Sequence, residues 1–278
     1  METVAILGAG LIGGSFALAL RKAGYSGRIL GVGSPETLDR ALALGVIDEP
    51  APLERAAAEA DLIYLAWPIR RIVQALPALE SWVRPDALVT DAGSTKSAIV
   101  RAARALTRCQ FLGGHPLAGN ERRGVRHADA ELFRGRTYVL TPEAPAELET
   151  PRAREFQHWL GAIGAVPLVL PAEQHDRVVA YTSHLPQLAS TALAAVLEAR
   201  PDLPLQVSGP ALRDSTRLAL SSFDIWGDIL ATNATSIEEA LAAYVEALDQ
   251  VRKDLRSDRI SGRFEAGARF ARRLRGAG

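Results

Sequence analysis

A strand-like run followed at once by a glycine turn opens the chain and limits what the rest can fold into. Thr3 to Leu7 is apolar, and Gly8, Gly10 and Gly13 follow with the spacing G-x-G-x-x-G. Small and apolar residues then continue to Ala23 with helical character. A strand, a glycine turn and a helix in this order are typical of a dinucleotide-binding fold, whereas the glycine spacing alone is weak evidence.

Each glycine of this turn has its own physical reason. Gly8 permits the tight turn, Gly10 lets the backbone approach a pyrophosphate, and Gly13 lets the helix lie close to the strand. The free N–H groups and the positive dipole end of that helix favour phosphates. A glycine-rich turn in another kind of α/β protein is the alternative. We expect the cofactor to contact Gly8, Ala9, Gly10, Leu11, Ile12 and Gly13.

Strand-like and helix-like segments alternate through the first half of the chain. The strand-like segments are Arg28 to Val32, Asp61 to Ala66 and Ala87 to Asp91, and Ile69 to Trp82 has a helical apolar face. This alternation predicts a parallel sheet with right-handed crossovers. Ligands of such sheets bind just past the carboxyl ends of the strands. Three segments at these strand ends are therefore candidates for the functional site: Ala66 to Pro68, Asp91 to Lys96, and Gly113 to Pro116. In the first of them we expect Ala66 and Pro68 to contact the cofactor.

The end of the second strand bears on the choice between NAD and NADP. An acidic residue at this tip marks NAD, but here Gly33 and Ser34 follow the strand, and Glu36 comes slightly late. Arg40 is placed to reach a 2′-phosphate, and Ser34 with Pro35 also fits a helix N-cap and first helical position. Gly33 and Ser34 are candidate cofactor contacts, and the 2′ group stays undecided.

His115 is the most distinctive single residue. Glycines precede it and Pro116 follows it, which leaves space around the imidazole at an expected strand end. An unperturbed histidine pKa of about 6.5 suits proton transfer at neutral pH. A buried histidine satisfied by backbone is the alternative. Of its neighbours, Ser94 fits either a helix N-cap or a hydroxyl offered to a ligand, and Lys96 is expected to be a solvated first-turn residue.

The pattern changes after Pro171. A strand over Val166 to Leu170 closes a dinucleotide-binding domain of residues 1–171, and residues 172–278 form a helical domain. The expected helices are Ala172–Ala199, Leu212–Leu220, Ile225–Ala231, Ser236–Leu255 and Gly262–Leu274.

Composition excludes several classes of protein. The 278 residues carry 32 basic and 32 acidic side chains with no basic tract, which argues against nucleic acid as a partner. A single cysteine, Cys109, rules out an internal disulfide framework, and the five histidines lack metal-ligand spacing. No apolar run reaches membrane-spanning length and no leader-like segment opens the chain. We expect a cytoplasmic protein without a metal.

Motifs along nearly the whole chain resemble those of the prephenate/arogenate dehydrogenase family. They are GAGLIGGS (8–15), DAGSTK (91–96), GGHPLAG (113–119), LF (132–133), LTP (140–142), HD (175–176), SHLP (183–186), RDSTRLA (213–219), IWGDI (225–229) and Asn233. They occur in the order of the family, and jointly they are far more specific than the glycine turn. Many members have a histidine where this chain has Gln187.

The resemblance implies a reaction and an architecture. The reaction is oxidative decarboxylation of prephenate to 4-hydroxyphenylpyruvate, with hydride transfer to NAD or NADP, in tyrosine biosynthesis. Arogenate, which gives tyrosine, is the alternative substrate. The architecture is an α/β fold, an N-terminal Rossmann-type domain with a C-terminal all-helical domain that forms a homodimer, without an ACT or chorismate mutase domain. The partner is a small-molecule substrate, with no nucleic acid or membrane.

The resemblance also implies roles for individual residues. His115 is the catalytic base, and Ser94, also near the cofactor, holds the substrate hydroxyl. Arg217 becomes a clamp for a substrate carboxylate, although alone it reads as a solvated or ion-paired arginine. His184 lines the substrate pocket, with a core histidine as its alternative. The expected substrate-binding residues are His184, Arg217, Gly119, Asn120 and Trp226.

Two other function classes compete. A β-hydroxyacid dehydrogenase or imine reductase also joins a dinucleotide domain to a helical dimer domain, but relies on a lysine deep in the helical domain. Here the only lysine of that region is Lys253, near the end of the chain. A non-catalytic NAD(P)-sensing module would not need the proton acceptor His115. The neighbouring pair His175 and Asp176 is expected to be structural, as a helix start at the domain junction.

Overall fold

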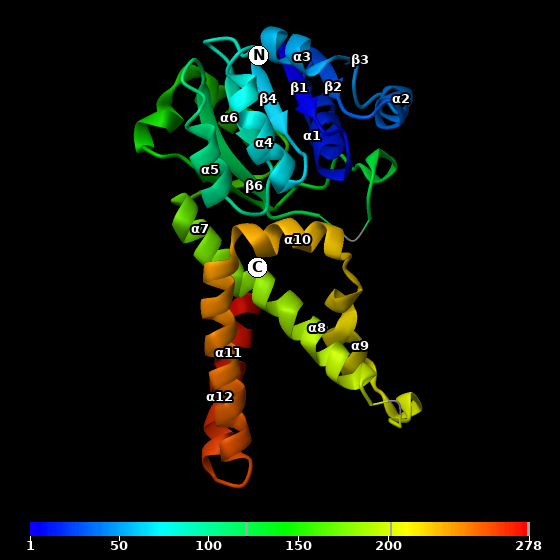
Figure 1. Ribbon diagram of the computed structural model, residues 1–278, viewed down its shortest axis with the longest axis vertical. Helices are drawn as coiled ribbons and strands as arrows, with labels where there is room; N and C mark the ends of the chain where they lie inside the picture. The colour runs from blue at the N-terminus through cyan, green and yellow to red at the C-terminus, as the bar shows by residue number, and fades with distance from the viewer. Residues whose placement is uncertain (120–121, 201, 277–278) are drawn as a thin grey trace.

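The computed structural model describes residues 1–119, 122–200 and 202–276. The first half of the chain builds one sheet of 8 strands in the order β3-β2-β1-β4-β5-β6-β7-β8 (Figure 1). All neighbouring strands are parallel except β6 and β7, so the predicted sheet is confirmed with one antiparallel pair. The strands are β1 Thr3–Leu7, β2 Arg28–Val32, β3 Glu49–Pro50, β4 Leu62–Leu65, β5 Leu88–Asp91, β6 Gln110–Pro116, β7 Thr137–Thr141 and β8 Val166–Val169.

Helices cover both faces of the sheet because side chains alternate along each strand. In β1, Val4 and Ile6 join the apolar cluster under α1, α2 and α6, whereas Ala5 and Leu7 join the cluster under α3, α4 and α5. The result is a three-layer, doubly wound domain. The helices are α1 Leu11–Lys22, α2 Pro35–Ala43, α3 Leu53–Glu59, α4 Ile69–Leu79, α5 Ser97–Ala103 and α6 Pro151–Ala162, with short 3-10 turns η1 Val125–His127 and η2 Pro145–Glu149.

The second half is helical, as predicted, but its first helix is interrupted. The run expected to be one helix consists of α7 (Ala172–Val179), a π-helical turn η3 (Ala180–His184) and α8 (Leu185–Glu198). Pro186 has no N–H to donate, so the regular hydrogen-bond ladder breaks at this point. The remaining elements are η4 Leu205–Val207, α9 Pro210–Thr216, η5 Arg217–Leu220, α10 Phe223–Thr232, α11 Ala234–Asp254 and α12 Arg259–Gly276.

The helical half forms two arms that diverge from the sheet domain (Figure 1). One arm holds α8 and α9, and the other is the hairpin of α11 and α12. The buried cluster between them is small, consisting of Ala180, Ile237 and Ala240. Many large apolar side chains of the helical half are exposed, which is unusual for a monomer. They include Val196, Leu205, Val207, Leu220, Phe223, Val245, Leu255, Phe264, Phe270 and Leu274.

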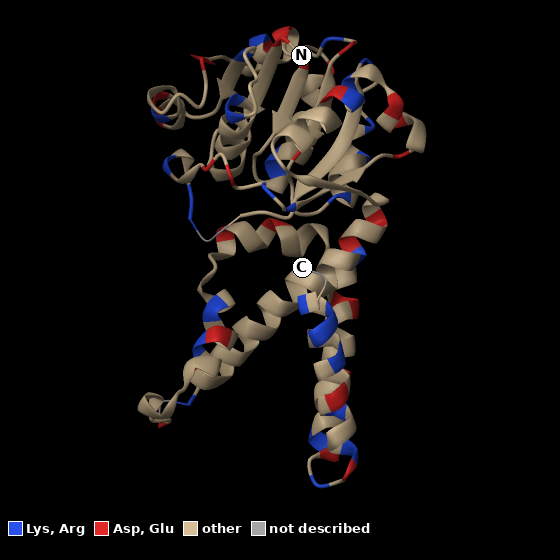
Figure 2. Ribbon diagram, turned by 180° about the vertical axis from the view of Figure 1, so that it is seen from behind, with Lys and Arg blue, Asp and Glu red and all other residues tan. Residues whose placement is uncertain are grey.

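Charges of both signs are interspersed along the α11–α12 hairpin (Figure 2). At its tip, Asp254 is buried and pairs with Arg259 at 3.1 Å and with Arg263 at 3.2 Å. Across the helices formed by the described residues, none combines the length and apolarity that a membrane span requires.

Helix α10 docks the helical half onto the sheet domain, below α4 in Figure 1. The Arg70 amide donates to the Asp228 carboxylate at 3.0 Å, and the Thr95 and Thr232 hydroxyls lie 2.7 Å apart. The carboxyl ends of β4 and β5 therefore face the helical half directly.

Candidate active site

The glycine turn has the geometry that a dinucleotide requires. Gly8 has φ +102°, and a Cβ there would lie 2.8 Å from the Ala66 carbonyl oxygen. A Cβ on Gly13 would lie 2.2 Å from the Gly8 carbonyl oxygen, so the strand and helix touch here. At Gly10, by contrast, no described atom lies within 4 Å of a Cβ position. Helix α1 starts at Leu11, and no side chain among the described residues caps it, so its first N–H groups stay available to a phosphate.

The other predicted cofactor residues surround this turn. Ala66 contacts Gly8 and Gly13, and Pro68 precedes the first residue of α4. Gly119, which is predicted to bind substrate, also lies near this turn, with its Cβ position 4.0 Å from Ile12 Cδ1. Trp67 fills the space beside Gly8, and the Arg71 guanidinium lies 3.9 Å from the centre of its ring. These residues fit a dinucleotide at the carboxyl end of β1 and β4.

Ser34 stands at the N-cap of α2, and its hydroxyl lies 2.9 Å from the Thr37 hydroxyl. Glu36 and Arg40 pair at 2.8 Å, and both side chains are exposed. The end of β2 thus offers both a carboxylate and a guanidinium near the expected position of the adenosine ribose, which is why sequence alone leaves the 2′ group open.

Replacing Gly13 with alanine should abolish tight dinucleotide binding, because the new Cβ cannot fit 2.2 Å from a carbonyl oxygen and must push α1 away from β1. We expect a Kd for the dinucleotide at least about tenfold higher, since the phosphate-binding helix end moves. Titration of intrinsic fluorescence measures the change. Gly161 is the matched control, since no described atom lies within 4 Å of its Cβ position and it occupies an exposed position of α6. Gly161→Ala should leave the Kd unchanged, and equal effects of the two variants would contradict this interpretation.

Lys96 is not a solvated residue, and that expectation is wrong. Its side chain is fully buried, pairs with Asp91, and donates to the Gly114 carbonyl at 2.6 Å. Burial lowers the pKa of Lys96, against the opposing effect of Asp91. The same Asp91 carboxylate accepts the Gly114 amide at 3.1 Å. Asp91 and Lys96 therefore clamp the backbone directly before His115.

Ser94 does not cap a helix. Helix α5 starts at Ser97 with Lys96 in the cap position, so the N-cap alternative is wrong. Ser94 is half-buried, and its hydroxyl forms no hydrogen bond with any residue that the structure describes. The hydroxyl is free to meet a ligand at the end of β5.

His115 lies at the end of β6 and contacts a second histidine from the helical half. Its Nδ1 is 2.8 Å from His175 Nε2, and the rings meet edge to face with centroids 5.0 Å apart. His175 Nδ1 in turn is 2.9 Å from Asp176 Oδ1. Burial, with His175, Lys96 and His184 nearby, holds the pKa of His115 well below its usual value. At neutral pH the His115 ring is therefore an acceptor for a proton.

The expectation that the pair His175 and Asp176 is only structural is therefore incomplete. The pair does start α7 at the domain junction, but His175 also touches the most distinctive histidine of the chain. A histidine followed by an aspartate at a helix start, with another histidine on the opposing domain, is the signal that could have identified it.

His184 belongs to the same cluster. It lies in the π-helical turn η3, a type of turn frequent at functional sites. Its Nδ1 is 3.3 Å from Asn233 Nδ2, and its ring meets that of Trp226 edge-on with centroids 5.8 Å apart. The structure thus brings together His115, His175, His184 and Trp226. The described ranges contain no cluster of three or more His, Cys, Asp or Glu side chains arranged to hold a metal ion.

The stability of the protein should depend on pH through His184. Burial lowers the pKa of this imidazole to about 4, whereas the unfolded chain titrates at about 6.5. As pH falls between these values the unfolded state binds the proton first, so stability is lost on acidification. The loss from this residue should reach about 3 kcal/mol. Urea unfolding between pH 7.5 and pH 4 measures it, and His184→Asn should flatten the profile. A wild-type profile as flat as that of the variant would contradict the assignment.

The predicted substrate contact Arg217 stands apart from this cluster. Arg217 opens η5, is exposed, and forms no ion pair with any described residue. Gln187 is buried and donates to the Leu218 carbonyl at 2.8 Å, which ties η5 to α8. Within this chain no described contact joins Arg217 to His115. Asn120 lies outside the described residues.

Comparison with known proteins identifies the family. Residues 16–166 match the family model described as prephenate dehydrogenase, nucleotide-binding domain, and residues 171–268 match prephenate dehydrogenase, dimerization domain. The prephenate dehydrogenase of Lactococcus lactis subsp. cremoris is 36% identical over 258 residues, covering 90% of this chain and 70% of that protein. The cyclohexadienyl dehydrogenase of Zymomonas mobilis is 32% identical over 261 residues, covering 91% and 88%.

Solved structures agree. A prephenate dehydrogenase from A. aeolicus in complex with hydroxyphenyl propionate and NAD+ has a TM-score of 0.91 at 29% identity, covering 99% of this chain and 98% of that one. Synechocystis arogenate dehydrogenase has a TM-score of 0.80 at 28% identity, with the same coverage.

The competing hydroxyacid class shares only the fold. A 3-hydroxyisobutyrate dehydrogenase from Mycobacterium tuberculosis has a TM-score of 0.55 at 19% identity, covering 80% of this chain and 72% of that one. Lys253, the lysine that such a mechanism would need, is exposed and pairs with Asp249 at 2.6 Å. Family models that match both halves, a relative 36% identical across 90% of the chain and the geometry of the turn agree: the chain belongs to the prephenate dehydrogenase family.

Proposed function

We propose that the protein catalyses the NAD(P)-dependent oxidative decarboxylation of prephenate to 4-hydroxyphenylpyruvate. The observation that carries this proposal is the position of His115, which lies half-buried at the carboxyl end of the sheet that holds the glycine turn, where burial holds the pKa of its ring well below the usual value. A dehydrogenase acting on an alcohol needs a proton acceptor at this place. The dinucleotide supplies the hydride acceptor.

The proposed reaction balances without an external acid. As hydride leaves C4 of the substrate ring, His115 takes the proton of the 4-hydroxyl and C4 becomes a carbonyl. The bond from the ring to its carboxylate then breaks, carbon dioxide leaves, and the electron pair flows through the ring to the carbonyl oxygen. His115 returns the proton to that oxygen, which is now the phenol of the product. The base is thus restored in each turnover.

Other side chains are proposed to bind and orient the substrate. Ser94 would donate its free hydroxyl to the substrate oxygen or accept from it, opposite His115. His184 and Trp226 would line the pocket on the helical side, where their rings already meet. Gly119, near the dinucleotide turn, and Asn120 would also bind the substrate. Residues 1–171 and 172–278 would act as cofactor and substrate domains.

Arg217→Gln should raise the KM for the substrate about tenfold or more while lowering kcat much less. The proposed role of Arg217 is to bind a substrate carboxylate equally in the ground state and transition state, and such uniform binding appears in KM. Steady-state kinetics at saturating dinucleotide measures both constants. Arg256→Gln is the matched control, an exposed arginine in the turn between α11 and α12. An unchanged KM in Arg217→Gln would contradict the proposed role of Arg217 in binding a substrate carboxylate.

We also propose that the protein is a homodimer formed through the helical half. The support is the dimerization-domain family match and the exposed apolar side chains of both arms. Because Arg217 is exposed and lies beside these arms, dimerisation would be the step that brings it to an active site. Light scattering after size exclusion should give about twice the chain mass, and a monomer at micromolar concentration would contradict the proposal.

Initial rates at 340 nm test the proposed activity. Purified protein is given prephenate or arogenate, each with NAD or NADP, and the four pairs are compared. Turnover of prephenate supports the proposal, and the preferred dinucleotide resolves the ambiguity at Glu36 and Arg40. The likeness to Synechocystis arogenate dehydrogenase favours arogenate as the second candidate, and turnover of arogenate alone would replace prephenate. No turnover of any pair by protein that binds a dinucleotide would overturn the proposal.

A further inference from the structure

We propose that Asp176 and His175 form a positioning pair that fixes the tautomer of His115, leaving Nε2 of His115 free to accept the proton. The proposal deepens the proposed function and rests on His115 being the base. It concerns which ring nitrogen is available, and this follows from the direction of each hydrogen bond.

The Asp176 carboxylate sets the direction of the hydrogen bonds that run through His175 to His115. Its carboxylate accepts the Lys96 amide at 2.6 Å and the Ser97 amide at 2.8 Å. Burial opposes ionisation of Asp176, but hydrogen bonds from His175, Ser97 and Lys96 outweigh it and hold the pKa of the carboxyl below its usual value. An ionised carboxylate only accepts hydrogen bonds.

The proton positions then follow along the chain of contacts. Since Asp176 only accepts, Nδ1 of His175 must carry the hydrogen that points to it, over 2.9 Å. The proposal takes His175 as a neutral imidazole, which has one donor and one acceptor nitrogen, so its Nε2 accepts. His115 Nδ1, 2.8 Å away, must therefore donate. The lone pair of His115 is left on Nε2, the nitrogen that faces no described partner.

The charge that His115 acquires also needs compensation. The Lys96 ammonium nearby opposes protonation of His115, and Asp91 already neutralises that ammonium. Among the residues that the structure describes, Asp176 is the other carboxylate connected to the ring, through the polarisable His175. The pair can therefore orient His115 and stabilise the imidazolium that forms, without itself taking the proton.

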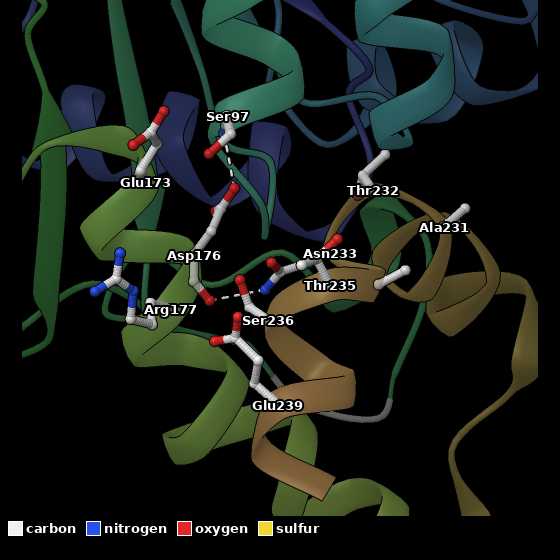
Figure 3. A pocket seen from close by; sticks show the side chains of 11 residues that line it. Ser97, Glu173, Asp176, Arg177, Ala231, Thr232, Asn233, Thr235, Ser236 and Glu239 are labelled. Carbon is white, nitrogen blue, oxygen red and sulfur yellow. Dashed lines mark hydrogen bonds between the residues drawn. The ribbon is translucent and has the colours of Figure 1, made fainter. Parts of the chain in front are cut away.

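The pair is held rigidly between the two halves of the protein. Asp176 lies on α7, yet its carboxylate binds the first turn of α5 in the sheet domain, and its backbone carbonyl accepts from Asn233 Nδ2 at 2.7 Å. Figure 3 shows both contacts at the wall of a pocket of about 580 Å³. His115 comes from β6 and His175 from α7, so the correct tautomer depends on docking of the two halves.

Two variants and one spectrum test the pair. His175→Phe keeps a ring but removes the acceptor, and His175→Gln restores an acceptor oxygen. We expect kcat to fall about 10²-fold or more in His175→Phe, with KM and dinucleotide Kd within about twofold of wild type, and part of the rate to return in His175→Gln. His158→Phe, at an exposed position, is the control and should keep full activity.

Nitrogen-15 spectra of imidazole-labelled protein report the tautomer without any substrate. The His115 signal, identified by its loss in His115→Asn, should show hydrogen on Nδ1 in wild type, and shift toward hydrogen on Nε2 in His175→Phe. Hydrogen on Nε2 in wild type, or full kcat in His175→Phe, would overturn the proposal. If His175→Phe does not fold, the tautomer seen in the wild-type spectrum and the kcat of His175→Gln still test the proposal. An Nδ1 hydrogen in protein that does not turn over prephenate would leave this inference standing and remove the proposed function.

Discussion

His115→Asn should lower kcat by about 10²–10⁴-fold, the range that a positioned general base contributes. Asparagine keeps a polar side chain of similar reach but cannot hold a proton at neutral pH. The residual rate comes from orientation of the substrate beside the dinucleotide. The KM for substrate and the Kd for the dinucleotide should change little, because the glycine turn and the residues proposed to bind the substrate stay in place. Initial rates at 340 nm and fluorescence titration measure these constants.

His158→Asn is the control for this variant. His158 lies on α6 with an exposed side chain and contacts only the neighbouring Trp159 ring among the aromatic contacts of the described residues. It should keep the wild-type kcat. If His115→Asn also kept it, another group would be the base, and the roles of Asp176 and His175 would fall with it.

Lys96→Met should destabilise the protein by about 3–5 kcal/mol, because it leaves the Asp91 carboxylate buried without its counter-ion. Lys96 and Asp91 are both 0% exposed. Methionine nearly fills the same volume but supplies neither the charge nor the hydrogen bond to the Gly114 carbonyl. The free energy of unfolding in urea measures the loss, and activity should fall as the backbone before His115 loosens.

Lys22→Met is the matched control for that substitution. Lys22 pairs with Glu131 at 2.6 Å, but both side chains are exposed, by 57% and 40%. Solvent screens such a pair, so its loss should cost less than about 1 kcal/mol. If both variants lost the same free energy of unfolding, the buried Lys96–Asp91 pair would stabilise the protein no more than an exposed pair does.

The sequence was sufficient to predict the glycine turn and the strands of the parallel sheet. The spacing of Gly8, Gly10 and Gly13 predicts the turn. Apolar runs that alternate with segments of helical periodicity predict the parallel strands. These signals act within a few residues, so they remain visible without the tertiary structure. The interruption by η3 was not part of the predicted helix Ala172–Ala199. A proline such as Pro186 indicates a disturbance of a helix but not its π-helical form.

Features set by contacts between distant segments were missed. Lys96 looks like a first-turn lysine until β6 brings Gly114 over it, 18 positions along the chain. His175 looks like an ordinary helix start until α7 docks on α5 and places it against His115, 60 positions away. The sequence motif predicts that Arg217 belongs to the substrate site, whereas in the single chain its side chain is exposed and does not contact His115. Its proposed role therefore depends on a second chain.

The central claim is that every hydride transfer assisted by His115 is followed by the loss of one carbon dioxide from the same substrate molecule. The most direct measurement is the amount of reduced dinucleotide and of carbon dioxide released by the same sample of protein with prephenate. The account predicts one carbon dioxide for each reduced dinucleotide in the wild type, and the same ratio at a much lower rate in His115→Asn. Reduced dinucleotide without carbon dioxide would describe a simple alcohol dehydrogenase and contradict it.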